Sequence, residues 1–317
     1  MVNTLVKEDR WLRETYVDWL IEAAAKDERI VLLEADLSKA AGTPRFKAAY
    51  PDRLVNVGIA EANMVGVAAG MNAMGKIPFT HTFTAFASRR CCDQVTLSVA
   101  YAGLNVKLMG SDPGVTAELN GGTHMSMEDV AIMRNIPGMV IYEPVDSAQL
   151  KKIMPQILDH EGPVYIRLLR RNAVQVFDDS DEFTLGKGTM IRPGSDVTII
   201  ASGIMVAEAI KAGEALAAEG IHAEIINIHT IKPLDEEMVL ASVRKTGCAV
   251  TAENGSILNG LGGAVCELLS EQLPVPVKRV GVRDHFGEVG FTPFLQEKYG
   301  LTDKEIIAAA KAAIAMK

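Results

Sequence analysis

The sequence lacks any uncharged apolar stretch of about 18 residues or more, so it offers no candidate membrane span. It also lacks a basic excess, because 32 Lys and Arg residues stand against 40 Asp and Glu residues, a formal net charge of −8. A nucleic-acid partner is not expected, since it would require positive charge to neutralise phosphates. The segment Met1–Arg13 is mixed in charge and has no apolar signal core, which favours a cytoplasmic location.

Cysteine is scarce, and its spacing argues against a zinc site. The cysteines are Cys91, Cys92, Cys248 and Cys266, none of which forms a Cys-x-x-Cys pair or stands at metal-ligand spacing from a histidine. We therefore expect packed, reduced thiols, as is usual in a cytoplasmic protein.

The chain does contain a regular alternation of short apolar runs and longer helical patterns. Because the runs lack polar alternation, they suit strands covered on both faces of a sheet. The pattern predicts an α/β fold with a mostly parallel, doubly wound sheet. The expected strands are 30–33, 54–57, 106–109, 140–142 and 164–166, and the main expected helices are 10–26, 62–74 and 147–158.

An acidic stretch over 176–188 separates this first unit from a second one of the same kind. We therefore divide the chain into domains 1–185 and 186–317. In the second domain the expected strands are 197–201, 223–228, 248–252 and 275–282, and the expected helices are 206–219, 235–244, 261–271 and 303–316. The glycine-rich run 259–263 is interpreted as a tight strand–helix turn, because it lacks Gly-x-Gly-x-x-Gly spacing.

Several separated segments carry a resemblance to one family. The first half resembles the pyrimidine-binding domain of transketolases, and the second half resembles the transketolase C-terminal domain throughout. The segments that carry it are Leu33-Glu34-Ala35-Asp36-Leu37, Asn56-Val57-Gly58-Ile59-Ala60-Glu61-Ala62-Asn63-Met64, Thr82-Phe83-Thr84-Ala85-Phe86, Gly121-Gly122-Thr123-His124 and Arg170-Arg171-Asn172.

The resemblance implies thiamine diphosphate as cofactor. Glu61 would hold a nitrogen of the aminopyrimidine ring and favour the imino form that deprotonates the thiazolium carbon. Phe83 and Phe86 would stack on the ring, and Asp36 would lie beside the cofactor. Apart from the resemblance, a glutamate at a helix start such as Glu61 is more often a capping residue, and phenylalanines three residues apart, such as Phe83 and Phe86, are more often core residues.

On the substrate side, His124 would contact the hydroxyls of a donor sugar, with His81 as a second candidate. Arg10 and Arg170 would clamp a phosphate, since the arginine fork matches phosphate oxygens. A surface-loop histidine and solvated surface arginines remain the alternatives. Arg89 and Arg90 are further basic residues to which the sequence assigns no role.

Three positions depart from the family's substrate site. Asp112 stands where ordinary transketolases have a histidine, Asn120 where they have an aspartate, and Ala40 where they have a serine that assists phosphate binding. Because a carboxylate at position 112 would weaken a phosphate site, we hypothesise a donor other than the standard pentose phosphates.

The sequence contains no Gly-Asp-Gly segment, which in the family binds the diphosphate and its Mg2+. We therefore expect an N-terminal transketolase subunit as partner, a homodimeric core of this chain and a heterotetramer. The alternatives are a 2-oxo acid dehydrogenase beta subunit, a 1-deoxyxylulose-5-phosphate synthase-like subunit, and a catalytically silent paired subunit.

Overall fold

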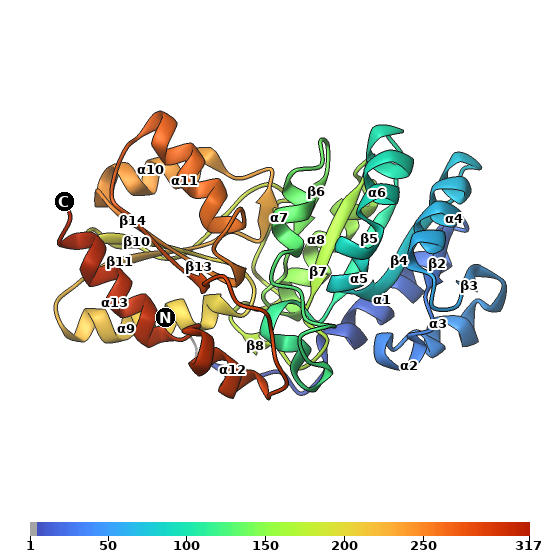
Figure 1. Ribbon diagram of the computed structural model, residues 1–317, viewed down its shortest axis with the longest axis horizontal. Coiled ribbons are helices and arrows are strands. Elements are labelled where there is room, and N and C mark those ends of the chain that lie inside the picture. Colours follow the sequence, from blue (N-terminus) through green and yellow to red (C-terminus); the bar gives the residue numbers. More distant parts are fainter. Residues whose placement is uncertain (1–4) are drawn as a thin grey trace.

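A computed structural model describes residues 5–317 and folds them around two principal sheets (Figure 1). The larger sheet has seven strands, and every neighbouring pair is parallel except the pair at the β12 edge. Its spatial order is β12 (Thr230–Lys232), β6 (Val140–Tyr142), β7 (Val164–Leu168), β5 (Lys107–Ser111), β4 (Ile77–Phe83), β2 (Ile30–Glu34) and β3 (Leu54–Asn56). The predicted doubly wound α/β fold is confirmed for this half.

Strand β4 was not predicted, although it lies in the middle of the sheet. Its seven residues are all buried, including the polar Thr80, His81 and Thr82. In the sequence, Pro78 and the polar residues 80–82 interrupt the apolar run 77–83, so the segment does not match the pattern of a buried strand. Since both neighbours of β4 are parallel strands, its carboxyl end meets those of β2 and β5 at one edge of the sheet.

Alternate residues of each strand pack on opposite faces. Ile30 and Leu32 join a core with helices α1 (Leu12–Lys26) and α8 (Ser147–Asp159). Val31 and Leu33 join a second core with α4 (Glu61–Ala73). Shorter helical segments complete this half: α2 (Ser38–Ala41), α3 (Pro44–Ala49), η1 (Pro51–Arg53), α5 (Thr84–Ala87), η2 (Arg89–Cys91), α6 (Cys92–Gln94), η3 (Val95–Tyr101), η4 (Gly114–Asn120) and α7 (Asp129–Arg134).

The second sheet has five strands and lies beside the first (Figure 1). Its central strands are parallel, and β9 joins one edge antiparallel. The order is β14 (Val277–Val282), β13 (Ala249–Ser256), β10 (Val197–Ala201), β11 (Ala223–Asn227) and β9 (Thr189–Arg192). The helices are α9 (Met205–Ala218), α10 (Glu236–Thr246), α11 (Leu261–Gln272), α12 (Thr292–Tyr299) and α13 (Asp303–Ile314).

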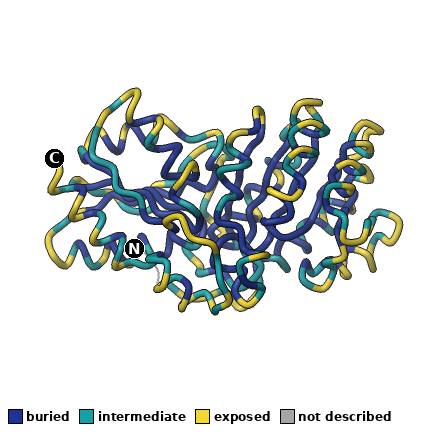
Figure 2. Tube along the Cα trace, in the orientation of Figure 1, coloured by how far each residue is buried: buried dark blue, intermediate teal, exposed yellow. Residues whose placement is uncertain are grey.

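The two halves are tied together more closely than a simple division at residue 185 implies. Strand β12 follows that division in sequence but completes the first sheet by pairing with β6. Strand β1 (Val6–Lys7) pairs with β8 (Val174–Gln175), which anchors the start of the described chain to the segment just before the acidic stretch 176–188. Figure 2 shows the buried trace continuing from one sheet into the other, with exposed residues at the loop tips and outer helices.

None of the helices in the described part of the chain is long and apolar enough to cross a membrane. All four cysteines are free, with Cys91 and Cys248 buried. Burial raises the pKa of the Cys91 thiol to about 12, which leaves it protonated and unreactive at neutral pH.

Candidate active site

An aromatic cluster lies at the carboxyl edge of the central strand. Phe83 ends β4 and Phe86 follows in α5, with ring centres 5.9 Å apart. The two rings form a small apolar cluster separate from both main cores. The His124 ring meets Phe86 at 5.1 Å and Phe83 at 6.0 Å, edge to face. This separation from the cores and the histidine contact support a ligand platform over ordinary core packing.

Glu61 opens α4 and is 2% exposed. Its carboxylate does not cap the helix; both oxygens accept from Arg90 Nη1 at 2.8 Å. The Arg90 Cζ atom also lies 3.6 Å from the centre of the Phe86 ring, within the range of a cation–π contact. A guanidinium thus joins the candidate acid to the aromatic platform. Arg90 had no role in the sequence analysis.

Asp36 lies at the end of β2, next to the loop that leads to Glu61. It is exposed and has a positive φ of 59°. The Oδ1 atom of Asn56 accepts from the Asp36 N–H at 3.1 Å and from the Gly58 N–H at 2.9 Å. Asn56 therefore ties the Asp36 turn to the glutamate loop. Glu34, in the same motif as Asp36, is buried and accepts from Ser38 and Thr43.

His81, the second candidate for contact with the donor sugar, is a buried residue of β4. Its ring packs edge to face against Tyr16 with 6.0 Å between centres. Neither ring nitrogen has a hydrogen-bond partner within residues 5–317. Burial, aided by Arg13 and Arg170, lowers the pKa of His81 to about 3, so the ring is neutral at physiological pH.

The structure joins Arg170 to Arg13, and Arg10 pairs elsewhere. Arg10 forms an ion pair with Asp18 at the helix surface. Helix α1 begins at Leu12, so Arg10 precedes the helix. The Trp11 N–H, just before this start, donates to Glu14 Oε2 at 3.1 Å. The Glu14 spacing after Trp11 is the signal that could have indicated this start.

Backbone hydrogen bonds bring the two arginines together. The Leu12 N–H donates to the Arg171 carbonyl at 2.9 Å, and the Arg13 N–H to the Arg170 carbonyl at 3.5 Å. Arg13 then donates to the carbonyl of Ala40, a position that the sequence connects with phosphate binding. Arg13 is the residue that the sequence analysis missed.

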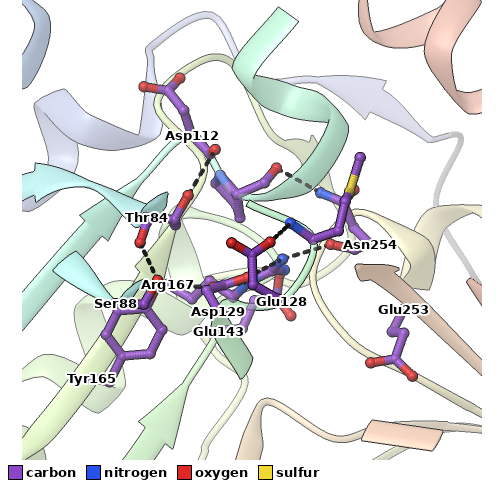
Figure 3. A network of polar contacts seen from close by, with 12 residues as sticks. Thr84, Ser88, Asp112, Glu128, Asp129, Glu143, Tyr165, Arg167, Glu253 and Asn254 are labelled. Atoms are coloured by element: carbon purple, nitrogen blue, oxygen red, sulfur yellow. Dashed lines mark hydrogen bonds and ion pairs between the residues drawn. The ribbon is translucent and has the colours of Figure 1, made fainter. Parts of the chain in front are cut away.

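Asp112 pairs with Arg170, which also approaches the aromatic platform. Its Oδ1 atom is 3.0 Å from Arg170 Nε, and Arg170 Cζ is 5.8 Å from the Phe83 ring centre. Asp112 is fully buried and has a φ of 59°, a conformation that Asp tolerates better than most residues. Burial raises the pKa of Asp112 to about 6, against the opposing effect of Arg170. The Thr84 hydroxyl donates to the Asp112 carbonyl at 3.2 Å (Figure 3).

Asn120 ends η4, and its Nδ2 atom is buried without a partner among the described residues. The loop continues through Gly121, with a φ of 74°, to His124. A Cβ atom at Gly122 would lie 2.2 Å from the Gly287 carbonyl oxygen. Gly122 is thus required by packing against the second domain. His124 Nδ1 lies 2.9 Å from the Thr123 hydroxyl.

A buried ionic network lies between the two sheets, below this edge (Figure 3). Arg167 of β7 contacts Asp129 through Nε at 2.8 Å, Glu143 through Nη1 at 2.5 Å, and the Asn254 carbonyl through Nη2 at 2.6 Å. All three side chains are buried. The network holds the second domain in register with the loops that carry Asp112 and His124, because Asn254 also accepts from the Val115 N–H at 3.0 Å.

Glu253 of β13 precedes the glycine-rich turn, and its side chain reaches the N-terminus of α11. Its carboxylate accepts from the N–H groups of Leu261 and Gly262, both at 2.8 Å. These are the groups that a dinucleotide phosphate would require, so the turn is confirmed as structural. Burial raises the pKa of Glu253 to about 7. Between residues 5 and 317, no group of three or more His, Cys, Asp or Glu side chains is arranged to hold a metal ion.

Comparisons with known proteins agree with this geometry. Residues 10–175 match the family model "Transketolase, pyrimidine binding domain", and residues 186–306 match "Transketolase, C-terminal domain". The 6-deoxy-6-sulfo-D-fructose transketolase subunit SqwH of Clostridium sp. (strain MSTE9) is 68% identical over 96% of this chain and 94% of its own length.

Two further matches delimit the assignment. A solved structure described as "Split gene transketolase, inactive beta4 tetramer" is 44% identical with a TM-score of 0.90, covering 98% of this chain and 100% of its own. The 1-deoxy-D-xylulose-5-phosphate synthase 1 of Geobacter sulfurreducens (strain ATCC 51573 / DSM 12127 / PCA) is 36% identical over 95% of this chain but only 47% of its own length. The chain therefore belongs to the transketolase family, as a transferase subunit of the split kind that carries the pyrimidine-binding and C-terminal domains.

Proposed function

We propose that this subunit binds the aminopyrimidine of thiamine diphosphate and a ketose donor at the carboxyl edge of β4, for transfer of a two-carbon ketol unit to an aldose. The observation that carries the proposal is the buried Glu61 carboxylate next to Phe83 and Phe86. A carboxyl group and an aromatic face are the two features that an aminopyrimidine ring requires. The residues present therefore fit this cofactor.

The cofactor, when bound, supplies the nucleophilic carbon. Glu61 hydrogen-bonds a ring nitrogen, and Phe86 with Phe83 orients the ring by stacking. Arg90 occupies both the Glu61 oxygens and the Phe86 face, so its side chain turns away when the ring binds. His124, at the edge of both phenylalanine rings, is positioned to hold donor hydroxyls, while Asp36 lines the turn next to Glu61.

The diphosphate and Mg2+ belong, in this proposal, to an N-terminal transketolase subunit. The absence of a Gly-Asp-Gly segment from the sequence supports this division. Two copies of the present chain form the core of a heterotetramer. In support, exposed apolar side chains lie on η3 (Leu97 and Tyr101) and at the two ends of α4 (Ile59 and Met74). We assign the complex to the cytoplasm, in keeping with the four free cysteines of this chain.

The donor that we propose is 6-deoxy-6-sulfo-D-fructose. The 68% identical SqwH subunit is named for that donor. The buried Asp112, in contact with Arg170, also argues against a phosphate site of the ordinary kind.

Reconstitution tests the proposal. The chain is mixed with its partner subunit, thiamine diphosphate, Mg2+, the sulfonated ketose and an aldose phosphate, and ketol transfer is followed. Glu61→Ala should abolish transfer, since it removes the group that controls the ring tautomer. Activity unchanged by Glu61→Ala would support a silent subunit, and pyruvate decarboxylation in place of transfer would support the dehydrogenase or synthase alternatives.

A further inference from the structure

We infer that Asp112 is a specificity-determining residue, which sets the charge of an Arg13–Arg170 anion site so that it selects a monoanionic sulfonate over a dianionic phosphate. This inference rests on the proposed function, because it assumes that the donor sugar lies on the Phe83 side of the platform. It goes further by assigning the discrimination to one carboxylate.

The first step is that the site is built and has unused hydrogen-bonding capacity. Arg13 Nε, Arg170 Nε, Asp112 Oδ1 and both His81 nitrogens are buried and have no hydrogen-bond partner within residues 5–317. Arg170 Nε and Asp112 Oδ1 are 3.0 Å apart as an ion pair, but they are not aligned as a hydrogen bond. Orphaned buried polar atoms at this density indicate a ligand site, since burying them without partners is costly.

The second step is that neighbouring charges are already neutralised. Arg171 Nη2 pairs with Glu118 Oε2 at 2.8 Å, and Glu118 is further fixed by the Thr292 hydroxyl at 2.6 Å. Asp18 is shared by Arg10 and Arg45 on the outer surface of α1. These pairs leave Arg13, Arg170 and Asp112 as a group with two positive charges and one negative charge.

The third step concerns net charge. His81 contributes none, because burial lowers its pKa to about 3. Asp112 is ionised at about pH 7.5, since its pKa is raised only to about 6. Two guanidinium groups and one carboxylate leave about one net positive charge, enough to balance a sulfonate. A phosphate ester is mostly dianionic at this pH because its second pKa is about 6. Its second negative charge is left unbalanced by the site and is repelled by the buried Asp112 carboxylate.

The test compares matched unreactive ligands by calorimetry on the full chain in its assembled complex. The ligands are glucitol 6-phosphate and 6-deoxy-6-sulfoglucitol. They are the forms of fructose 6-phosphate and of 6-deoxy-6-sulfofructose that are reduced at the carbonyl carbon, so they lack the carbonyl that reacts. The native protein should prefer the sulfonate. Asp112→Asn, which keeps the size and tolerates the same backbone conformation, should shift the ratio of the two dissociation constants toward phosphate by roughly ten-fold.

Two variants keep the test decisive. Asp18→Asn removes the same charge from α1 outside the site, and it should leave the ratio unchanged. Arg170→Gln should weaken both ligands. A folded Asp112→Asn protein with an unchanged ratio would overturn the inference. Absence of ketol transfer with intact binding discrimination would instead contradict only the proposed reaction, because the calorimetric readout does not depend on turnover.

Discussion

Arg90 Nη1 donates to both carboxylate oxygens of Glu61 at 2.8 Å, while its guanidinium lies over the Phe86 ring. The same arginine therefore satisfies the buried carboxylate and covers the aromatic face beside it. In the proposed site, Arg90 therefore occupies the positions that we assign to the aminopyrimidine ring.

Arg90→Met should lower the free energy of unfolding of the isolated chain by about 1–3 kcal/mol, since it leaves a buried carboxylate without a partner. Urea unfolding measures this loss. In Glu61→Gln the buried charge is gone, so adding Arg90→Met to it should cost much less. Equal losses in the two backgrounds would mean that the Arg90–Glu61 contact contributes nothing to stability.

Phe86→Leu should weaken binding of thiamine diphosphate by roughly five-fold in the assembled complex, because an aromatic contact contributes about 0.5–1.5 kcal/mol beyond its buried area. Fluorescence titration with the cofactor gives the dissociation constant. Phe294→Leu makes the same change at an exposed residue and should leave affinity unaltered. Unchanged affinity in Phe86→Leu would remove Phe86 from the platform.

Tyr101→Asp should convert a dimer of the chain into monomers. Tyr101 is 88% exposed at the end of η3, and Met74, 84% exposed, lies just beyond the end of α4, so a buried charge there would oppose self-association. Sedimentation velocity reports the oligomeric state. Met316→Asp, an equally drastic change near the C-terminus, serves as control. A Tyr101→Asp dimer of native affinity would exclude this face as the interface.

Arg167→Met should destabilise the protein by about 3–5 kcal/mol, because two buried carboxylates, Asp129 and Glu143, lose their counter-charge. Chemical denaturation provides the measurement. Arg134→Met is the matched control, since Arg134 also joins the halves, through Glu267 at 2.6 Å, but with a partly exposed partner; it should cost about 1 kcal/mol or less. A cost for Arg167→Met no larger than for Arg134→Met would contradict a structural role for the network.

Glu253 gives a pH-dependent prediction. Burial raises its pKa from 4.5 to about 7. Between these two values the folded state keeps a proton on Glu253 that the unfolded state releases. Its contribution to stability is therefore fully present below about pH 4.5 and is lost as the pH rises through about 7. Glu253→Gln should show a smaller fall in unfolding free energy between about pH 5 and pH 8 than the native chain. Glu271→Gln, at an exposed position of α11, is the control and should follow the native curve. A Glu253→Gln curve that also follows the native one would mean that burial does not raise the pKa of Glu253.

The sequence predicted most elements because their determinants are local. Apolar runs such as 30–33 and 164–166 became β2 and β7, and Thr302 caps α13 by accepting from the Lys304 N–H at 3.3 Å. The order of short motifs around Glu61 and His124 predicted the family. Strand β4 was not predicted because Thr80, His81 and Thr82 interrupt its apolar run, and only the packing of the neighbouring elements buries these polar residues.

The tertiary structure alone decided which charges meet. Nothing in the sequence connects Arg90 with Glu61, since their contact depends on the positions of α4 and η2 over one sheet edge. Likewise Arg13 replaced Arg10 beside Arg170 because the backbone of α1 bonds to the segment after β7. Periodicity and motif order are properties of neighbouring residues, and the sequence determined them. Contacts between charged side chains on separate elements depend on how those elements pack, so only the fold could establish them.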